Sequence, residues 1–250
     1  MDYLTQYYDK VIDELREILE QEKEKIKRAG AWIGQAIMDG RLLHVWGTGG
    51  HSSILGEEIL YRAGGLVAVN AILDPGVSLM CGARRTTKIE RLEGYAPRIL
   101  TLYNLEPGDV MVIVNAPGMN AMTIDTALEC KKLGLKTIAI TSPAWSHAIP
   151  PEQPGRHSSK KNLYQIVDMY IDCKTAPGDA LVNIQGCQQP VGPSSTIAMA
   201  SIAHSLNIAA TEFMVANGFE PPIIKSANMP GGDEANQKYF SQYASRCRHL

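Results

Sequence analysis

Short apolar segments alternate with helical segments along most of the chain, and this alternation is the feature that most restricts the fold. Buried strands are predicted at Leu42–Trp46, Leu66–Ile72, Asp109–Val114, Lys136–Ile140 and Val167–Cys173. Helices are predicted between them, at about 52–63, 96–103 and 121–133. This order is typical of an α/β protein whose doubly wound parallel sheet is flanked by helices.

A long amphipathic segment precedes the first predicted strand. Apolar side chains recur at three- and four-residue spacing from residue 3 to residue 38, which predicts one long helix. At about 1.5 Å per residue it would run roughly 50 Å, longer than a compact domain needs. We therefore expect residues 1–40 to form a dimerisation helix in a homodimer or higher homo-oligomer, and residues 41–250 to form the main domain with its C-terminal helices. The alternative is a helix that breaks near Ala29-Gly30-Ala31 and lies on its own domain.

Charge and cysteine content narrow the class of protein. The 250 residues contain 24 Lys and Arg against 26 Asp and Glu, and a net charge of −2 indicates neither a nucleic-acid nor a membrane-surface partner. The five cysteines form no CxxC pair, which is typical of reduced thiols in a cytosolic protein. No segment reads as a signal peptide or a membrane span. These observations predict a cytoplasmic protein.

Three turns follow predicted strands and should meet at one edge of the sheet. Ligands of parallel sheets bind outside the carboxyl ends of the strands, where we expect the turns at 47–53, 115–120 and 141–147. The first turn begins Gly47-Thr48-Gly49-Gly50 and would expose N–H groups at a helix start, which suits an anion such as phosphate. It matches neither the dinucleotide nor the P-loop motif, and the alternative is a tight packing turn.

The candidate ligand-binding residues come from these turns and from the segment at 142–162, whose Pro, Ser, Gly and His content is typical of a binding loop. They are Gly49, Gly50, His51, Ser52, Ser53, Asn115, Gly118, Asn120, Thr141, Ser142, His157 and Lys160. No close spacing of His, Cys and carboxylates predicts a metal site, and no G-x-S-x-G motif predicts a nucleophilic serine. We expect no cofactor.

Three titratable side chains are candidates for catalysis. Glu57 and Glu58 follow the first turn, and a carboxylate beside a sugar carbon can move a proton between neighbouring carbons. His204 lies in the apolar helix predicted at 194–217, and a histidine can shuttle the proton that opens a sugar ring. Each has a plainer alternative: Glu58 could form a surface ion pair with Arg62 four residues on, and His204 could be a core residue.

These residues resemble a known family. Gly47-Thr48-Gly49-Gly50 leading to Glu57-Glu58, then the turn at 115–120 and Thr141-Ser142, are similar to the three ligand loops of SIS (sugar isomerase) domains. A closer resemblance is to stand-alone SIS proteins described as phosphosugar-binding proteins or isomerases. Its marks span residues 47–234 and are Glu57-Glu58-x-x-Tyr61-Arg62-Ala63-Gly64-Gly65, Glu90-Arg91-Leu92-Glu93-Gly94-Tyr95-Ala96, Arg156-His157-Ser158-Ser159, Gly178-Asp179-Ala180 and Ser226-Ala227-Asn228…Gly231-Gly232-Asp233-Glu234.

The resemblance implies a flavodoxin-like, three-layer SIS domain with a phosphosugar pocket formed in a dimer, and aldose–ketose isomerisation through an enediol. Glu58 matches the catalytic Glu of sedoheptulose-7-phosphate isomerases, with Glu57 as the alternative base. His204 matches, more loosely, the catalytic His on their late helix. Ile54 stands where some of these isomerases have a zinc-binding His, so their metal is not carried over.

The second turn departs from the family pattern. SIS phosphate turns usually read Ser-x-Ser-Gly-x-Ser/Thr, whereas this chain has Asn115-Ala116-Pro117-Gly118-Met119-Asn120. Three hydroxyl donors are missing, and Pro117 has no N–H. The ligand could therefore be a sugar phosphate or an unphosphorylated sugar. Three hypotheses stay open: an isomerase or another SIS enzyme (deaminase, deglycase or etherase), a non-catalytic sugar-phosphate sensor, and an assembly protein with a vestigial pocket.

Overall fold

The centre of the fold is a five-stranded parallel sheet with the strand order β2-β1-β3-β4-β5, in a computed structural model that describes residues 2–250. The strands are β1 (Leu43–Gly47), β2 (Val69–Ala71), β3 (Val110–Val114), β4 (Lys136–Thr141) and β5 (Met169–Asp172). Every residue of β1 and β3 is buried, because these apolar runs are covered on both faces. The order is the flavodoxin-like doubly wound one, so the predicted fold class is confirmed.

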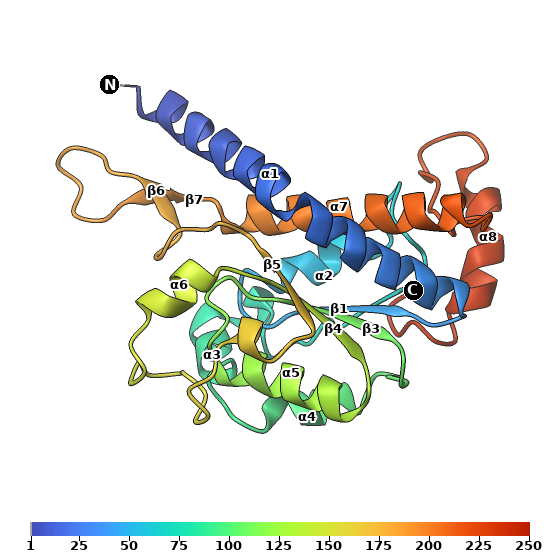
Figure 1. The fold of residues 1–250 in the computed structure, drawn as a ribbon, viewed down its shortest axis with the longest axis horizontal. Helices are drawn as coiled ribbons and strands as arrows, with labels where there is room; N and C mark the ends of the chain where they lie inside the picture. The colour runs from blue at the N-terminus through green and yellow to red at the C-terminus, as the bar shows by residue number, and fades with distance from the viewer. Residues whose placement is uncertain (1) are drawn as a thin grey trace.

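Helices cover both faces of this sheet (Figure 1). One face carries α1 (Tyr3–Met38), α2 (Ile54–Ile59) and α7 (Ser195–Ala216), with α8 (Gly232–Tyr243) at one end. The other face carries α3 (Ala83–Ile89), α4 (Tyr95–Leu100) and α5 (Ala121–Lys132). Successive residues of β1 point to opposite faces of the sheet, so Val45 packs in the apolar core of the first face and Trp46 in that of the second.

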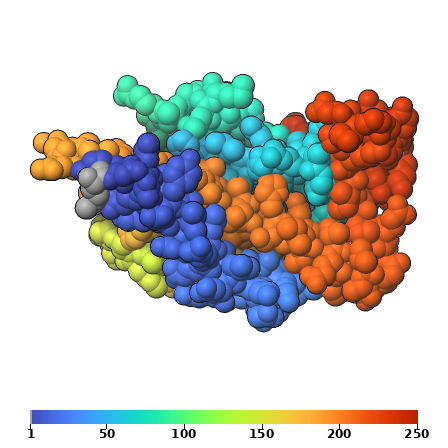
Figure 2. Space-filling view, turned by 90° about the horizontal axis from the view of Figure 1, so that it is seen from above, coloured from blue at the N-terminus to red at the C-terminus, as the bar shows by residue number. Residues whose placement is uncertain are grey.

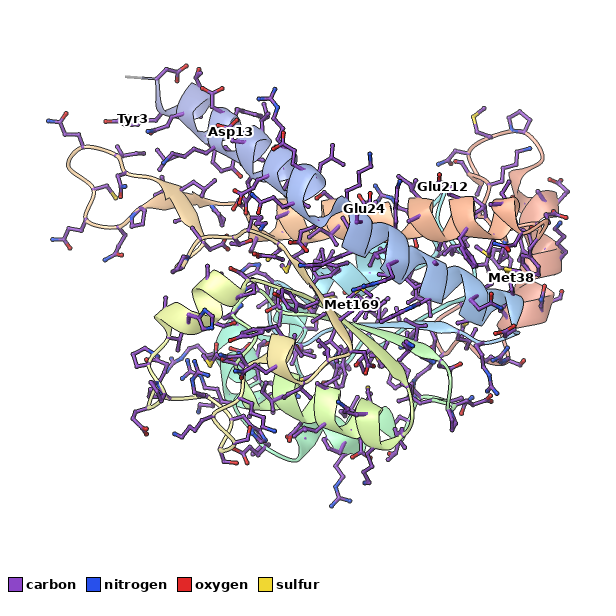
Figure 3. The ribbon with its side chains drawn as sticks, in the orientation of Figure 1. Tyr3, Asp13, Glu24, Met38, Met169 and Glu212 are labelled. Carbon is purple, nitrogen blue, oxygen red and sulfur yellow. The ribbon has the colours of Figure 1, made fainter. Side chains whose placement is uncertain are left out.

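The first helix is uninterrupted, so no break occurs at Ala29-Gly30-Ala31. Figure 3 places Tyr3 and Asp13 on the half of α1 that extends beyond the sheet, toward a hairpin formed by β6 (Ala180–Val182) and β7 (Val191–Pro193). Its second half runs along α7. The two helices are close because Gly30 has no side chain: a Cβ there would lie 2.4 Å from Ala209 Cβ.

Several predicted segments near the carboxyl edge of the sheet differ from the structure. The helix predicted at 52–63 ends at Ile59, because Leu60 is extended and Tyr61 has a φ of +52°. The segment at 142–162 is not all loop but contains α6 (Pro143–Ala148), whose first turn is capped by Ser142. Between β2 and β3 the chain folds into a 3-10 turn (Leu79–Cys81) followed by α3, neither of which periodicity predicted.

Candidate functional site

The first two predicted ligand turns meet at the point where the strand order reverses. After β1 the chain adds β2 on one side of it and then crosses to add β3 on the other side, so the strand order reverses between β1 and β3. Doubly wound sheets bind ligands in the crevice at such a point. Asn115 Nδ2 donates a hydrogen bond to Thr48 O at 3.4 Å. A Cβ on Gly49 would lie 2.9 Å from the same nitrogen. The structure therefore brings the turns after β1 and β3 into contact, as the sequence predicted.

Glu90 also lies at this meeting point, and sequence analysis did not select it. Its Oε2 would be 3.2 Å from a Cβ on Gly49, and its carboxylate faces the Gly50 N–H and the Asn120 side chain. Burial raises the pKa of the Glu90 carboxyl, against the opposing effect of Arg91. In the sequence, Glu90 belongs to one of the motifs shared with stand-alone SIS proteins, but it was not predicted to bind a ligand because no helix was predicted at 83–89. We call Gly49-Gly50, the turn at 115–120 and Glu90 the cradle.

Several of the predicted ligand residues are held by contacts within the protein. Asn115 Oδ1 accepts from the Gly118 N–H at 2.8 Å, and Ser53 Oγ donates to Gly50 O at 2.8 Å. Thr141 Oγ donates to Ala116 O at 3.1 Å, and the buried Ser142 Oγ donates to Thr175 O at 2.7 Å. These bonds fix the shape of the turns. Ser52 is buried in the first turn, while His51 is exposed there.

The side chains of His157 and Lys160 make their hydrogen bonds outside the cradle. His157 Nε2 lies 3.2 Å from Asp125 Oδ1 on α5, and its Nδ1 lies 2.8 Å from Ser159 Oγ. The His157 N–H donates to Met119 O at 3.1 Å, which ties the loop to the second turn. Lys160 Nζ donates to Pro151 O and to Glu152 Oε2, at 3.0 and 3.2 Å. The positive charge of Lys160 is therefore directed into its own loop.

Glu58 and His204 meet between α2 and α7, although 146 residues separate them in the chain. His204 Nε2 lies 3.0 Å from Glu58 Oε1, while Arg62 Nη1 donates to Glu58 Oε2 at 3.2 Å. The surface ion pair and the contact with His204 thus coexist on the two oxygens of one carboxylate. The Glu58 side chain is 27 % exposed and that of His204 is 38 % exposed, so a ligand can reach both. A carboxylate in contact with an imidazole is suited to moving protons.

Glu57 faces a different side of α2. It lines an open hollow of about 220 Å³ together with Ser53, Leu73, Asp74, Pro75, Ser78, Met80 and Cys81. Tyr95 OH donates to Asp74 Oδ2 at 2.9 Å beside this hollow, and burial together with Asp74 raises the pKa of Tyr95 to about 12. Successive residues of a helix point about 100° apart, which separates the Glu57 carboxylate from the contact between Glu58 and His204.

Among residues 2–250, no group of three His, Cys, Asp or Glu side chains is arranged to hold a metal ion. No helix in the described part of the chain combines the length and the apolar character needed to cross a bilayer.

Comparison with known proteins gives a family. A family model described as SIS domain matches residues 6–142. A UPF0309 protein from Geobacillus thermodenitrificans (strain NG80-2) is 36% identical over 243 residues, which cover 97% of this chain and 96% of the relative. The predicted resemblance to stand-alone SIS proteins is thereby confirmed.

Two solved structures share the fold at low sequence identity. A phosphoheptose isomerase from Francisella tularensis aligns with a TM-score of 0.55 and 15% identity, over 84% of this chain and 97% of its own. The Vibrio vulnificus NanR protein complexed with ManNAc-6P aligns with a TM-score of 0.50 and 14% identity, over 98% of this chain and 69% of its own. With the family model and the UPF0309 relative, the conclusion is that this chain belongs to the SIS domain family.

Proposed function

We propose that this protein is a sugar isomerase that binds a sugar or sugar phosphate at the carboxyl edge of its sheet and interconverts aldose and ketose. The observation that carries the proposal is the 3.0 Å contact between Glu58 and the partly exposed His204. The two residues come from different helices, and packing of α2 on α7 holds them together.

The chemistry is proton transfer between neighbouring carbons. In an open-chain sugar, Glu58 takes the proton from the carbon beside the carbonyl, and the electron pair moves to the carbonyl oxygen to give an enediolate. His204 transfers the proton of the neighbouring hydroxyl to that oxygen, and Glu58 returns its own proton to the former carbonyl carbon, which leaves the carbonyl on the neighbouring carbon. His204 also assists ring opening. Arg62 supports the role of Glu58 because it holds the other carboxylate oxygen and so fixes the direction in which Oε1 points.

A ligand screen followed by an exchange experiment tests the proposal. Pentoses, hexoses and heptoses, each with and without phosphate, are screened by thermal shift. A ligand at 100 times its Kd stabilises the fold by about 2.7 kcal/mol. Each hit is then incubated with the protein in D2O, and NMR should show deuterium at the carbon beside the carbonyl. A hit without exchange would favour the non-catalytic sensor, and the lack of any hit would contradict the sugar pocket.

Large apolar side chains are exposed on α1 and α7. Figure 2 shows α1 and α7 together on one surface. Ile208, one turn after His204 on α7, is 69% exposed, and α1 carries the exposed apolar side chains of Leu4, Tyr8, Ile12 and Leu19. Large exposed apolar side chains on two neighbouring helices favour self-association. We propose that the protein is a homodimer in which the partner covers the surface beside Glu58 and His204.

Ile208→Glu should convert this dimer to a monomer in size-exclusion chromatography with light scattering. The substitution buries a charge against an apolar partner surface, which disfavours association. Leu128→Glu is the matched control, because Leu128 is a partly exposed leucine on α5 in the opposite layer. A wild-type protein that is monomeric at micromolar concentration would refute the dimer.

A further inference from the structure

A carboxylate lies in the cradle where a phosphate-binding loop would present donors alone. We propose that Glu90 excludes phosphate from the cradle and accepts hydrogen bonds from sugar hydroxyl groups there. This inference rests on the proposed function, which identifies the ligand as a sugar. It adds that the part of the sugar bound in the cradle carries no phosphate.

The position of Glu90 is set by two elements. It directly follows α3, and its backbone O accepts from the Met122 N–H of α5 at 3.1 Å. Its side chain then reaches the first turn, where Oε2 would be 3.2 Å from a Cβ on Gly49. The carboxylate therefore lies over the glycines whose N–H groups the sequence assigned to an anion, and its negative charge opposes a phosphate at the same place.

The charges around Glu90 do not reverse this effect. Arg91 is the cation that acts on Glu90, but its side chain packs against the loop at Gly155, where a Cβ would lie 2.6 Å from Arg91 Cγ. Lys160 bonds to Glu152 in that loop. Arg91 thus offsets part of the Glu90 charge from the neighbouring loop, while the Lys160 charge is engaged with Glu152.

A carboxylate in the cradle suits hydroxyl groups. A sugar hydroxyl both donates and accepts, and a carboxylate can accept from two neighbouring hydroxyls. Glu90 supplies the acceptor, and the Gly50 N–H and the Asn120 side chain donate to it and hold it in place. The second turn has none of the three hydroxyl donors usual in phosphate turns. The missing hydroxyl donors and the added carboxylate both disfavour phosphate in the cradle and favour sugar hydroxyl groups.

Inorganic phosphate is the probe that tests this directly, because its binding depends neither on the sugar nor on turnover. The protein is labelled with 15N-glycine, and the Gly49, Gly50 and Gly118 amide signals are followed as phosphate is added to wild type, Glu90→Gln and Glu90→Ala. We expect both variants to bind phosphate at least about ten-fold more tightly than wild type, as judged from these signals. Glu93→Gln is the control, because Glu93 bonds to Ser158 on the exposed loop.

Two outcomes would overturn the proposal. In the first, wild type binds phosphate at these glycines as tightly as the Glu90 variants do. In the second, Glu93→Gln gains as much affinity as Glu90→Gln, which would mean that general surface charge controls phosphate binding. Failure of the isomerase proposal is recognised separately, because it removes deuterium exchange without changing the phosphate titration.

Discussion

Glu58→Gln should lower kcat for isomerisation by about 10²–10⁴, the usual contribution of a positioned proton-transfer group. Glutamine has nearly the size of glutamate but cannot take a proton from carbon, so the sugar should bind with little change in Kd. Loss of kcat with binding retained is the pattern expected when an interaction acts only in the transition state. Deuterium exchange at the carbon beside the carbonyl measures this loss, and isothermal titration measures the Kd.

Two variants make the result specific. Glu212→Gln alters an exposed glutamate on α7, about two turns beyond His204, and should keep the wild-type kcat. Glu57→Gln tests the alternative base, which lines the separate hollow. If Glu57→Gln loses turnover while Glu58→Gln keeps it, the assignment of the base to Glu58 is wrong and the chemistry belongs on the other side of α2.

The parallel sheet could be predicted because its strands are continuous apolar runs. The predicted strand at 109–114 and β3 differ by one residue, and the helix predicted at 121–133 is α5. The spacing of apolar residues within each of these segments is enough to show whether it forms a buried strand or an amphipathic helix. The same pattern predicted that the turns after β1 and β3 lie at one edge of the sheet. The two turns are in contact because β1 and β3 are neighbouring strands.

The parts that could not be predicted depend on contacts distant in the chain. Residues 73–95 mix polar residues and glycines without a clear period, so neither α3 nor the position of Glu90 could be predicted. The helix bearing Glu57 and Glu58 ends early because Tyr61 adopts a left-handed conformation, which no residue-type rule predicts for tyrosine. Glu58 and His204 could be proposed as a pair by resemblance, but their contact follows from how α2 packs on α7.

The other side of α7 packs on α1, where Gly30 lies against it. A Cβ at Gly30 would be 2.4 Å from Ala209 Cβ and 2.8 Å from the backbone N of Ala210, and neither atom belongs to a flexible side-chain end. Gly34, one turn later, faces Ala210 and Phe213. These two glycines let α1 and α7 approach along one seam, and α7 carries His204 less than two turns away. The seam therefore supports both the fold and the proposed site.

Gly30→Val should lower the free energy of unfolding by about 3 kcal/mol or more, at the upper end of overpacking effects. For a chain of this length, that corresponds to a fall in Tm of roughly 6–12 °C in thermal unfolding. Lys23→Val is the matched control, because it places the same side chain on the exposed side of α1 and should change stability by only a few tenths of a kcal/mol.

Gly30→Ala separates packing from helix propensity. Alanine favours a helix over glycine by about 1 kcal/mol, so an open site would make this variant more stable than wild type. We expect a net loss instead, because the new methyl group meets α7 backbone that cannot rotate aside. A Gly30→Ala protein more stable than wild type would show that α7 shifts freely. In that case the contact between His204 and Glu58 would need another source of rigidity than the α1–α7 seam.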